Sequence, residues 1–249
     1  MGGDRNLEMT RRRFFAPPSA FNFNKRTVTL ASDEARHLRE VLRLKPGDEV
    51  QVFDGEGKEF RAAVAQARRE CAELEIRDEI DAMRPESPLE LTLAVALLKG
   101  EKFDLVVQKG TELGVKQFIP LITRHADIKL RDEADATKRV TRWQRIALEA
   151  AKQSGRAVVP DVTMPLPFAS IVRENSCLMF SERGGQPLNT DLKTIIAIIG
   201  SEGGWSDEEL DQARAENVSI VTLGGRILRA ETAAIATAAL LQHLYGDLK

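Results

Sequence analysis

The chain is poor in the residues that metal sites and disulfide scaffolds need. Its 249 residues include two cysteines, Cys71 and Cys177, and three histidines, His37, His125 and His243. Two thiols so far apart in the sequence exclude a disulfide framework and suit a reducing compartment. The histidines stand far from one another and from both cysteines, so we expect no metal site.

Long apolar runs and phosphate-binding glycine motifs are also missing. No apolar stretch approaches the roughly 20 residues that span a bilayer, and the polar start lacks the apolar core of a signal peptide. We therefore expect a cytoplasmic protein with no membrane partner. The pattern GxxxxGK[ST] is absent and GxGxxG does not follow a strand, which argues against a polyphosphate cradle and against a nicotinamide enzyme.

The formal net charge of −2 gives no nucleic-acid signal for the chain as a whole, but the charge is unevenly distributed. Between Arg11 and Lys45 there are nine lysines and arginines against three acids. Such a patch is the electrostatic footprint expected for phosphate contacts. A solvated surface with chance clustering is the alternative.

Short strands and one helix dominate the first 80 residues. Apolar and polar side chains alternate, as in half-buried strands, over residues 26–30, 49–54, 59–67 and 71–80. A helix is predicted over residues 33–43, with Ser32 as its N-cap. Its spacing predicts that Leu38, Val41 and Leu42 face inward and that Arg36, Arg39 and Arg43 face outward. Many short strands with one helix suggest a small β-barrel.

A linker with two prolines, Asp81–Pro88, separates this part from a region with a different pattern of predicted strands and helices. Strands are predicted over residues 89–98, 117–123, 177–181, 194–199 and 219–223, and helices over 102–113, 134–154, 207–216 and 231–245. Strands that alternate with helices indicate a largely parallel α/β sheet. We therefore expect a flexible start over residues 1–10, a small β domain over 11–82 and an α/β domain over 83–249.

Glycine-rich loops follow three of the late predicted strands, at residues 181–185, 200–205 and 224–229. In open parallel sheets, ligands bind beyond the carboxyl ends of the strands, and glycines let the backbone approach a ligand closely. Ser206 and Glu209 form a predicted capping box at the start of the following helix. Glycines in one such loop could simply make a turn, but three successive loops favour a ligand site, for which a nucleoside held by backbone groups fits best.

Arg229 precedes the last predicted helix, where the positive end of the helix dipole disfavours a cation. This position suggests a task such as holding a phosphate or a developing negative charge. A surface arginine that reaches away from the helix end is the alternative.

The late loops resemble those of the ribosomal RNA small subunit methyltransferase E family, within the SPOUT class. The resemblance rests on Ile199–Ser206 with Glu209 and on Leu223–Ala233. It extends upstream through His37-Leu38, Val41–Arg43, Gly47-Asp48, Lys99-Gly100, Lys102, Gln108-Lys109, Glu112–Val115, Trp143–Glu149, Gln153-Ser154 and Arg156. Proline is usual in the family where Ser201 stands, and threonine where Ala230 stands. We expect these departures to weaken cofactor binding at most.

The resemblance implies a SPOUT-type α/β sheet with a trefoil knot and helices on both faces, preceded by a PUA-like RNA-binding β-barrel domain. It implies a homodimer that transfers a methyl group from S-adenosylmethionine to N3 of one uridine in small-subunit (16S) ribosomal RNA. The cofactor-binding residues that it implies are Leu178, Phe180, Ile199, Gly200, Ser201, Glu202, Gly203, Gly204, Leu223, Gly224, Ile227, Leu228, Arg229 and Thr232.

For catalysis, we expect Arg229 to stabilise the negative charge that spreads over the uracil carbonyl groups, and Glu202 is a weaker candidate for proton acceptor. The residues expected to contact RNA are Arg12, Arg13, Arg36, Arg39 and Arg43, with Lys99, Lys102 and Arg124 near the cleft. Two alternatives stay open: a SPOUT methyltransferase acting on another ribosomal or transfer RNA nucleoside, and a non-catalytic RNA-binding assembly factor. The partner would be the small ribosomal subunit or its RNA.

Overall fold

The computed structural model describes residues 12–126, 128–188 and 193–249, and the predicted flexible residues 1–10 lie outside this part. The chain divides into two compact units. One contains the residues up to Glu86 together with Ala151–Val159, and the other contains Ser87–Ala150 and Pro160–Lys249.

The sequence had placed residues 151–159 in the second domain, and the structure differs here for a clear reason. Backbone hydrogen bonds tie this segment to the turn at residues 54–57: Gly57 N donates to Ala157 O (3.2 Å), and Val159 N donates to Gly55 O (2.9 Å). In addition, the Arg156 guanidinium pairs with Glu86 at 2.6 Å. The segment therefore belongs to the first unit.

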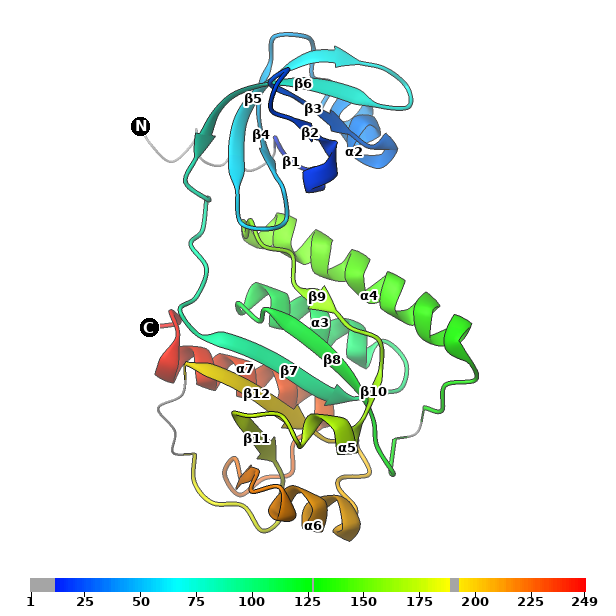
Figure 1. Ribbon diagram of the computed structural model, residues 1–249, viewed down its shortest axis with the longest axis vertical. Helices are drawn as coiled ribbons and strands as arrows, with labels where there is room; N and C mark the ends of the chain where they lie inside the picture. Colours follow the sequence, from blue (N-terminus) through cyan, green and yellow to red (C-terminus); the bar gives the residue numbers. More distant parts are fainter. Residues whose placement is uncertain (1–11, 127, 189–192) are drawn as a thin grey trace. The chain divides into compact units, whose positions relative to one another are not determined.

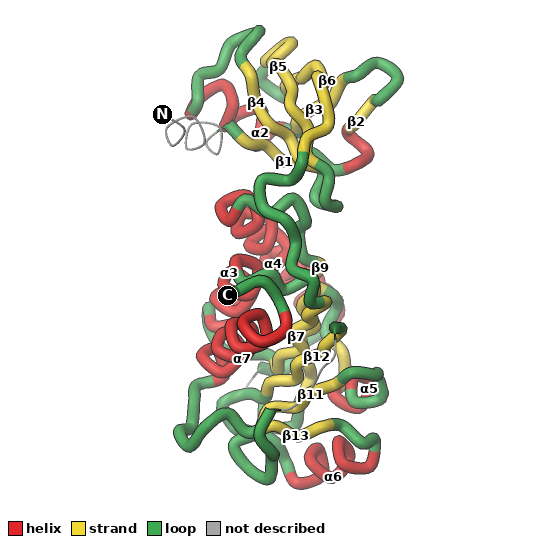
Figure 2. The backbone as a smooth tube through the Cα atoms, turned by 90° about the vertical axis from the view of Figure 1, so that its left-hand side faces the viewer, coloured by secondary structure: helices red, strands yellow, loops and turns green. Residues whose placement is uncertain are grey.

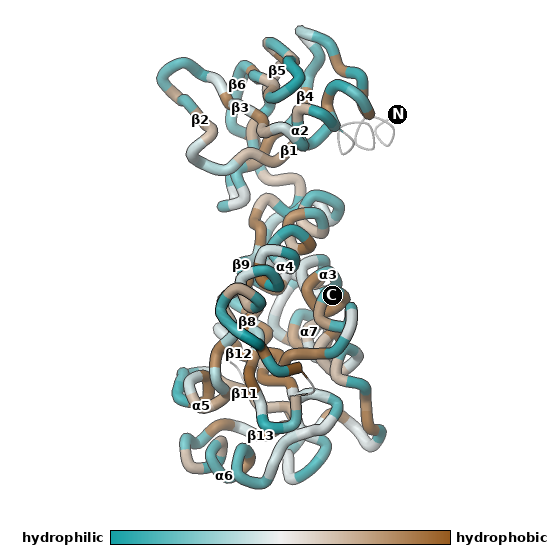
Figure 3. The backbone as a smooth tube through the Cα atoms, turned by 90° about the vertical axis from the view of Figure 1, so that its right-hand side faces the viewer, coloured by the Kyte–Doolittle hydropathy of each residue, from teal (hydrophilic) through white to brown (hydrophobic). Residues whose placement is uncertain are grey.

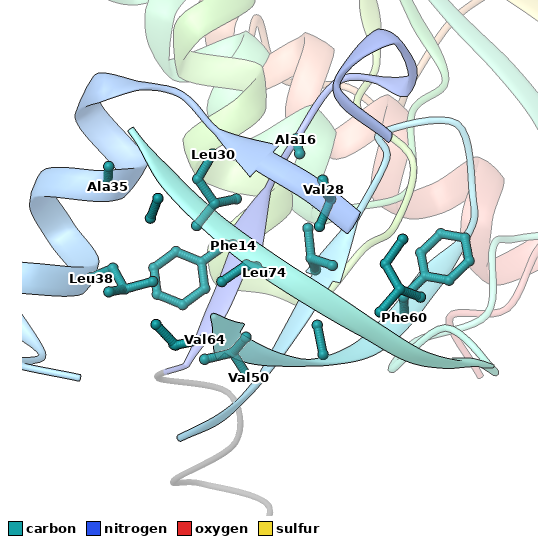
Figure 4. Packing of buried hydrophobic residues seen from close by; sticks show 14 of the residues in the cluster. Phe14, Ala16, Val28, Leu30, Ala35, Leu38, Val50, Phe60, Val64 and Leu74 are labelled. Carbon is teal, nitrogen blue, oxygen red and sulfur yellow. The ribbon is translucent and has the colours of Figure 1, made fainter. Parts of the chain in front are cut away.

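The first unit contains a six-stranded sheet around one apolar core. Its strands, in spatial order, are β1 (Arg13–Phe15), β4 (Glu49–Phe53), β5 (Glu59–Ala67), β6 (Ala72–Ile80), β3 (Thr27–Leu30) and β2 (Phe21–Asn22). Only the β1–β4 pair is parallel. Alternate side chains such as Phe14, Val50 and Leu74 point into the core, as Figure 4 shows. The four longer strands match the predicted ones, whereas β1, β2 and the short helical turn η1 (Pro18–Ala20) were missed.

The helix of this unit differs from the predicted one. It begins as α2 (Ser32–Arg36) and continues as a π-helical turn, η2 (His37–Val41), in which Leu42 N donates to His37 O five residues back. The wider turn changes the phase of the side chains, so Val41, predicted to face inward, is 65% exposed. Ser32 is also not the N-cap, because Ala31 occupies that position.

The second unit contains a sheet in which every pair of neighbouring strands is parallel, as predicted. The order is β10 (Leu166–Pro167), β8 (Gln117–Ile122), β7 (Glu90–Ala96), β12 (Thr194–Ile199), β11 (Cys177–Phe180) and β13 (Ser219–Val221), with β9 (Asp161–Val162) also paired to β8. Two-residue strands such as β9 and β10 carry too short a pattern to be predicted. The central strands are strongly apolar (Figure 3).

Helices cover both faces of this sheet, which confirms the predicted α/β architecture (Figures 1 and 2). One face carries α3 (Lys102–Glu112) and α7 (Ala230–Tyr245), and α4 (Glu133–Ser154) contacts α3 through Trp143 and Phe103, whose ring centroids are 4.2 Å apart. The other face carries α5 (Phe168–Ile171) and α6 (Asp207–Ala215). Within the described ranges, no helix combines the length and apolar character that a bilayer crossing requires.

The strand order positions the glycine-rich loops. Strands β12, β11 and β13 are direct neighbours and run in the same direction, so their carboxyl ends lie at one edge of the sheet. The loops that follow them therefore meet, although the strands are separated in the sequence.

Candidate functional site

The three glycine-rich loops and the start of α7 enclose a cleft of about 770 Å³, including its open mouth. Nine of the predicted cofactor-binding residues line it: Phe180, Ile199, Gly200, Ser201, Gly204, Leu223, Gly224, Ile227 and Leu228. The cleft is also lined by residues that were not among the predicted cofactor-binding residues: Ser181, Glu182, Trp205, Thr222, Gly225, Arg226, Ala230 and Ala233.

The other five predicted residues lie outside the lining. Leu178 is buried within β11, between β12 and β13. Glu202 pairs with Lys102 of α3 and Gly203 lies against His125, while Arg229 and Thr232 are exposed at the start of α7. The cleft is therefore lined by most of these segments but not by every residue in them.

Trp205 anchors the loop after β12. Its indole N–H donates to Phe180 O at 2.8 Å, and its ring packs against Phe168 with centroids 5.1 Å apart. The side chain is 2% exposed. The position of Trp205 at the end of a glycine-rich loop is the sequence signal that indicates this role. A large ring next to glycines fills the space that their missing side chains leave.

The loop between β8 and α4 contacts the loop after β12 at close range. A Cβ atom on Gly203 would lie 2.7 Å from His125 Cβ and 3.0 Å from His125 O. His125 Nδ1 lies 3.1 Å from Gly203 O, and Ser201 Oγ donates to His125 O at 2.9 Å. A proline at position 201 could not donate this bond, so the serine that departs from the family pattern ties the loop down by other means.

The predicted capping box is confirmed. Ser206 Oγ accepts the Glu209 N–H at 3.2 Å, and Glu209 Oε2 accepts the Ser206 N–H at 3.0 Å. The other carboxylate oxygen of Glu209 accepts the Arg124 N–H at 2.9 Å. The start of α6 is thereby fixed to the chain that follows β8.

Beside the cleft, three charged groups from three segments form an ion cluster. The Lys102 ammonium pairs with Glu202 and lies 3.8 Å from Glu231 Oε2. The pKa of Lys102 is raised, chiefly by the hydrogen bond to Glu202. Burial acts to raise the pKa of Glu202, but the hydrogen bond from Lys102, a backbone hydrogen bond and the charges of Lys102 and Lys99 outweigh it, so this pKa is lowered.

Arg229 occupies the N-cap position of α7 and is exposed, as its predicted role requires. Its charge is near enough to Lys102 to lower the pKa of that ammonium in part. In the part of the chain that the structure describes, Arg229 forms no ion pair, so its guanidinium can bind a ligand.

The structure places the residues predicted to contact RNA in different surroundings. Lys99, Arg36, Arg43 and Arg124 are exposed, Arg12 is half-buried, and Arg39 donates to Arg68 O and pairs with Glu40. Lys102 is engaged in the ion cluster. Arg13 is a correction: its side chain is 1% exposed, pairs with the buried Glu59 at 2.7 Å and lies 3.9 Å from the centroid of the Phe53 ring. A buried arginine of this kind cannot reach a phosphate.

Among the described residues, no group of three or more histidines, cysteines and carboxylates is arranged to hold a metal ion.

Comparison with known proteins defines the class of the chain. Residues 85–242 match the RNA methyltransferase domain, and residues 30–76 match the RNA methyltransferase PUA domain. The chain is 39% identical to ribosomal RNA small subunit methyltransferase E of Synechocystis sp. over 83% of its own length and 70% of the relative's. It is 31% identical to the protein of that name from Rickettsia conorii, over 87% and 90% of the two chains.

The fold agrees with these matches. The crystal structure of a ribosomal RNA small subunit methyltransferase E from Neisseria gonorrhoeae, bound to S-adenosylmethionine, superposes with a TM-score of 0.84 at 34% identity, covering 96% of this chain and 99% of that one. The chain therefore belongs to the ribosomal RNA small subunit methyltransferase E family. The family and the PUA-like first domain predicted from the sequence are confirmed.

Proposed function

We propose that the chain transfers a methyl group from S-adenosylmethionine to N3 of one uridine in 16S ribosomal RNA, on the assembled small subunit. The observation that carries this proposal is the three-loop cleft at the carboxyl ends of β12, β11 and β13, with the exposed Arg229 at its rim. Ribosomal RNA as substrate also fits a cytoplasmic location.

The cleft suits a nucleoside cofactor. Ile199, Leu223 and Leu228 offer apolar surface for an adenine ring, and the backbone at Gly200 and Gly224 offers polar groups without intervening side chains. When bound, the cofactor supplies an electrophilic methyl group on a sulfonium.

The residues of the chain would prepare the nucleophile. Loss of the N3 proton to solvent water spreads negative charge onto the two flanking carbonyl oxygens of uracil, and a guanidinium at the cleft rim stabilises that charge. Arg229 fits this task because it is exposed and forms no ion pair with the described residues.

The geometry favours a bracing role for Glu202 over that of proton acceptor. Its carboxylate is paired with Lys102 and its pKa is lowered, which makes it a weaker base. In this role Glu202 holds the loop after β12 against α3.

We also propose that the three loops thread as a trefoil knot and that the chain acts as a homodimer. The sides of α7 not covered by the sheet and α3 remain apolar and partly exposed, and a second copy would cover them. These residues are Ile235, Ala236, Ala239, Leu240 and Leu244. Light scattering coupled to gel filtration tests the dimer, and a monomer at micromolar concentration would contradict it.

The function is tested by transfer of labelled methyl groups from S-adenosylmethionine to small subunits that lack the modification, with naked 16S RNA and transfer RNA alongside. We expect 3-methyluridine on the subunits. Label in another nucleoside would indicate the alternative substrate. Cofactor binding without transfer to any of these RNAs would exclude the proposed substrate, and absence of cofactor binding would favour a non-catalytic assembly factor.

A further inference from the structure

Three phenylalanines of the first unit form an aromatic cluster that reaches the surface. Phe60 in β5 is 3% exposed and forms its base. The ring of Phe21 in β2 lies 5.2 Å from that of Phe60, and the ring of Phe23 lies 5.8 Å from it. Phe23, in the turn after β2, is 59% exposed. Phe23 thus presents a largely exposed ring on a buried aromatic base.

The two outer rings are stacked. The planes of Phe21 and Phe23 differ by 19°, with centroids 5.7 Å apart. Phe21 therefore covers one side of the Phe23 ring, and the exposed fraction of Phe23 shows that much of the ring remains open to solvent. A second planar group can extend this stack on the open side.

The turn that carries Phe23 is held in place. Asn22 Oδ1 accepts the Lys25 N–H at 3.1 Å, and Arg26 N donates to Phe23 O at 3.2 Å. Arg26 has a φ of 52°, and its guanidinium donates to Arg77 O. Because the ring is fixed before any ligand arrives, binding to it costs little conformational entropy.

Two cations share the turn with the ring. Lys25 and Arg26 are exposed in the same turn. The nearest carboxylates on β6 are already paired, Glu75 with Arg77 at 3.0 Å and Asp78 with Arg61 at 2.7 Å. Glu79, also on β6, adds a third carboxylate to the strand segments beside the two cations of the turn.

This cluster is separate from the basic helix. Figure 4 shows Phe60 at the opposite end of the labelled core from Ala35 and Leu38, which belong to α2 and η2. The first unit therefore has a second surface with RNA-binding chemistry.

We propose that the Phe23 ring is a stacking platform for an unpaired base of the RNA substrate, with Lys25 and Arg26 contacting the flanking phosphates. This inference rests on the proposed function, because that function makes RNA the substrate. Aromatic side chains next to cations are how proteins hold single-stranded RNA, since every base has a stacking face. If the ring instead bound a partner protein, that binding would not depend on an unpaired base.

The test uses the full chain and a uridine oligoribonucleotide with one central 2-aminopurine, whose fluorescence is quenched by stacking. We expect the wild-type chain to bind and quench this probe. Phe23→Leu keeps an apolar side chain but lacks the π face, so it should bind roughly 5- to 100-fold more weakly and lose the quench. Phe23→Trp should retain both. Met164→Leu, at a residue 40% exposed on the second unit, is the matched control and should bind like wild type.

Wild-type affinity and quenching in Phe23→Leu, or no binding of the probe by the wild-type chain, would overturn the inference. Melting temperatures of all variants check that each is folded. Methyl transfer to small subunits, measured with the wild-type chain, separates the two proposals. If methyl transfer occurs but binding of the probe does not depend on Phe23, only the stacking platform is contradicted. If binding depends on Phe23 but no methyl group is transferred, only the proposed function is contradicted.

Discussion

The Lys102 ammonium is paired with the Glu202 carboxylate, which links the first turn of α3 to the loop after β12. The same ammonium lies 3.8 Å from Glu231 in the first turn of α7. Lys102 therefore holds together three segments around the cleft. We therefore propose a positioning role for Lys102, which stands beside the RNA contact that the sequence predicted.

Removal of the Lys102 charge should loosen the cofactor loop. We expect Lys102→Met to weaken S-adenosylmethionine binding several-fold in calorimetry while leaving the salt dependence of RNA binding nearly unchanged. The exposed Lys99 is the matched control: Lys99→Met should lower the slope of log affinity against log salt by about one and spare cofactor binding. A changed salt slope in Lys102→Met would return Lys102 to the RNA interface.

The lowered pKa of Glu202 predicts a specific pH dependence. A carboxylate whose pKa is depressed in the folded state stabilises it fully above the ordinary glutamate pKa of about 4.3, and this contribution disappears as the pH falls through the lower folded value. The difference in melting temperature between wild type and Glu202→Gln should therefore be constant from pH 5 to 8 and shrink below pH 4. A difference that varies between pH 6 and 8 would mean that Glu202 titrates near neutrality, as a proton acceptor could.

Arg229→Ala should slow methyl transfer while cofactor affinity stays largely intact. By analogy with the loss of one donor to a developing anion, we expect a decrease of about 10²- to 10³-fold in kcat. Arg229→Lys should recover part of the rate because it keeps the charge. Arg214→Ala, which removes an exposed arginine paired with Asp211 on α6, is the control. Full activity in Arg229→Ala would remove the assignment.

Gly203 and Gly225 offer a matched pair of glycine substitutions. A Cβ at Gly203 would collide with His125, whereas a Cβ at Gly225 meets nothing within 4 Å. Gly203→Ala should lower the stability of the second unit by about 1–3 kcal/mol, and Gly225→Ala should leave it nearly unchanged. Urea denaturation of both variants measures this difference, and equal stabilities would show that the loop near His125 shifts freely.

Substitutions at Arg13 and Arg12 distinguish a structural role from a surface role. Arg13 and Glu59 form a buried pair, and removal of one partner leaves an uncompensated charge that costs about 3–5 kcal/mol. Arg13→Gln should therefore lower the free energy of unfolding by this amount, whereas Arg12→Gln, at a half-buried neighbour, should have a small effect on stability. Chemical denaturation followed by fluorescence distinguishes them, and a stable Arg13→Gln variant would contradict the structural role.

The long helices and strands were predicted well because each is long enough to show a complete pattern of apolar and polar residues. The strand at residues 194–199 and the capping box at Ser206 and Glu209 were found where expected. Position along a pattern does not reveal a change of helix type, so the π turn reversed the expected direction of Val41. Nor does a cluster of cations distinguish Arg13, which meets a carboxylate 46 residues away, from its exposed neighbours.

The candidate site was predicted only in part, because sequence patterns are local. The loops were located from their glycines, but the partner of Glu202 comes from α3, 100 residues earlier. Only the fold brings these residues together, since no local pattern records an ion pair over such a separation.

The return of residues 151–159 to the first unit means that the chain passes between the two units three times: after Glu86, after Ala150 and after Val159. A gene fragment that ends at residue 86 would encode a sheet whose Gly57 N–H lacks its acceptor and whose Glu86 lacks Arg156. The first unit is thus not a module that recombination can move as a single piece. A transfer of this unit to another methyltransferase would have to include two separated stretches of sequence. The two units are therefore expected to be inherited together.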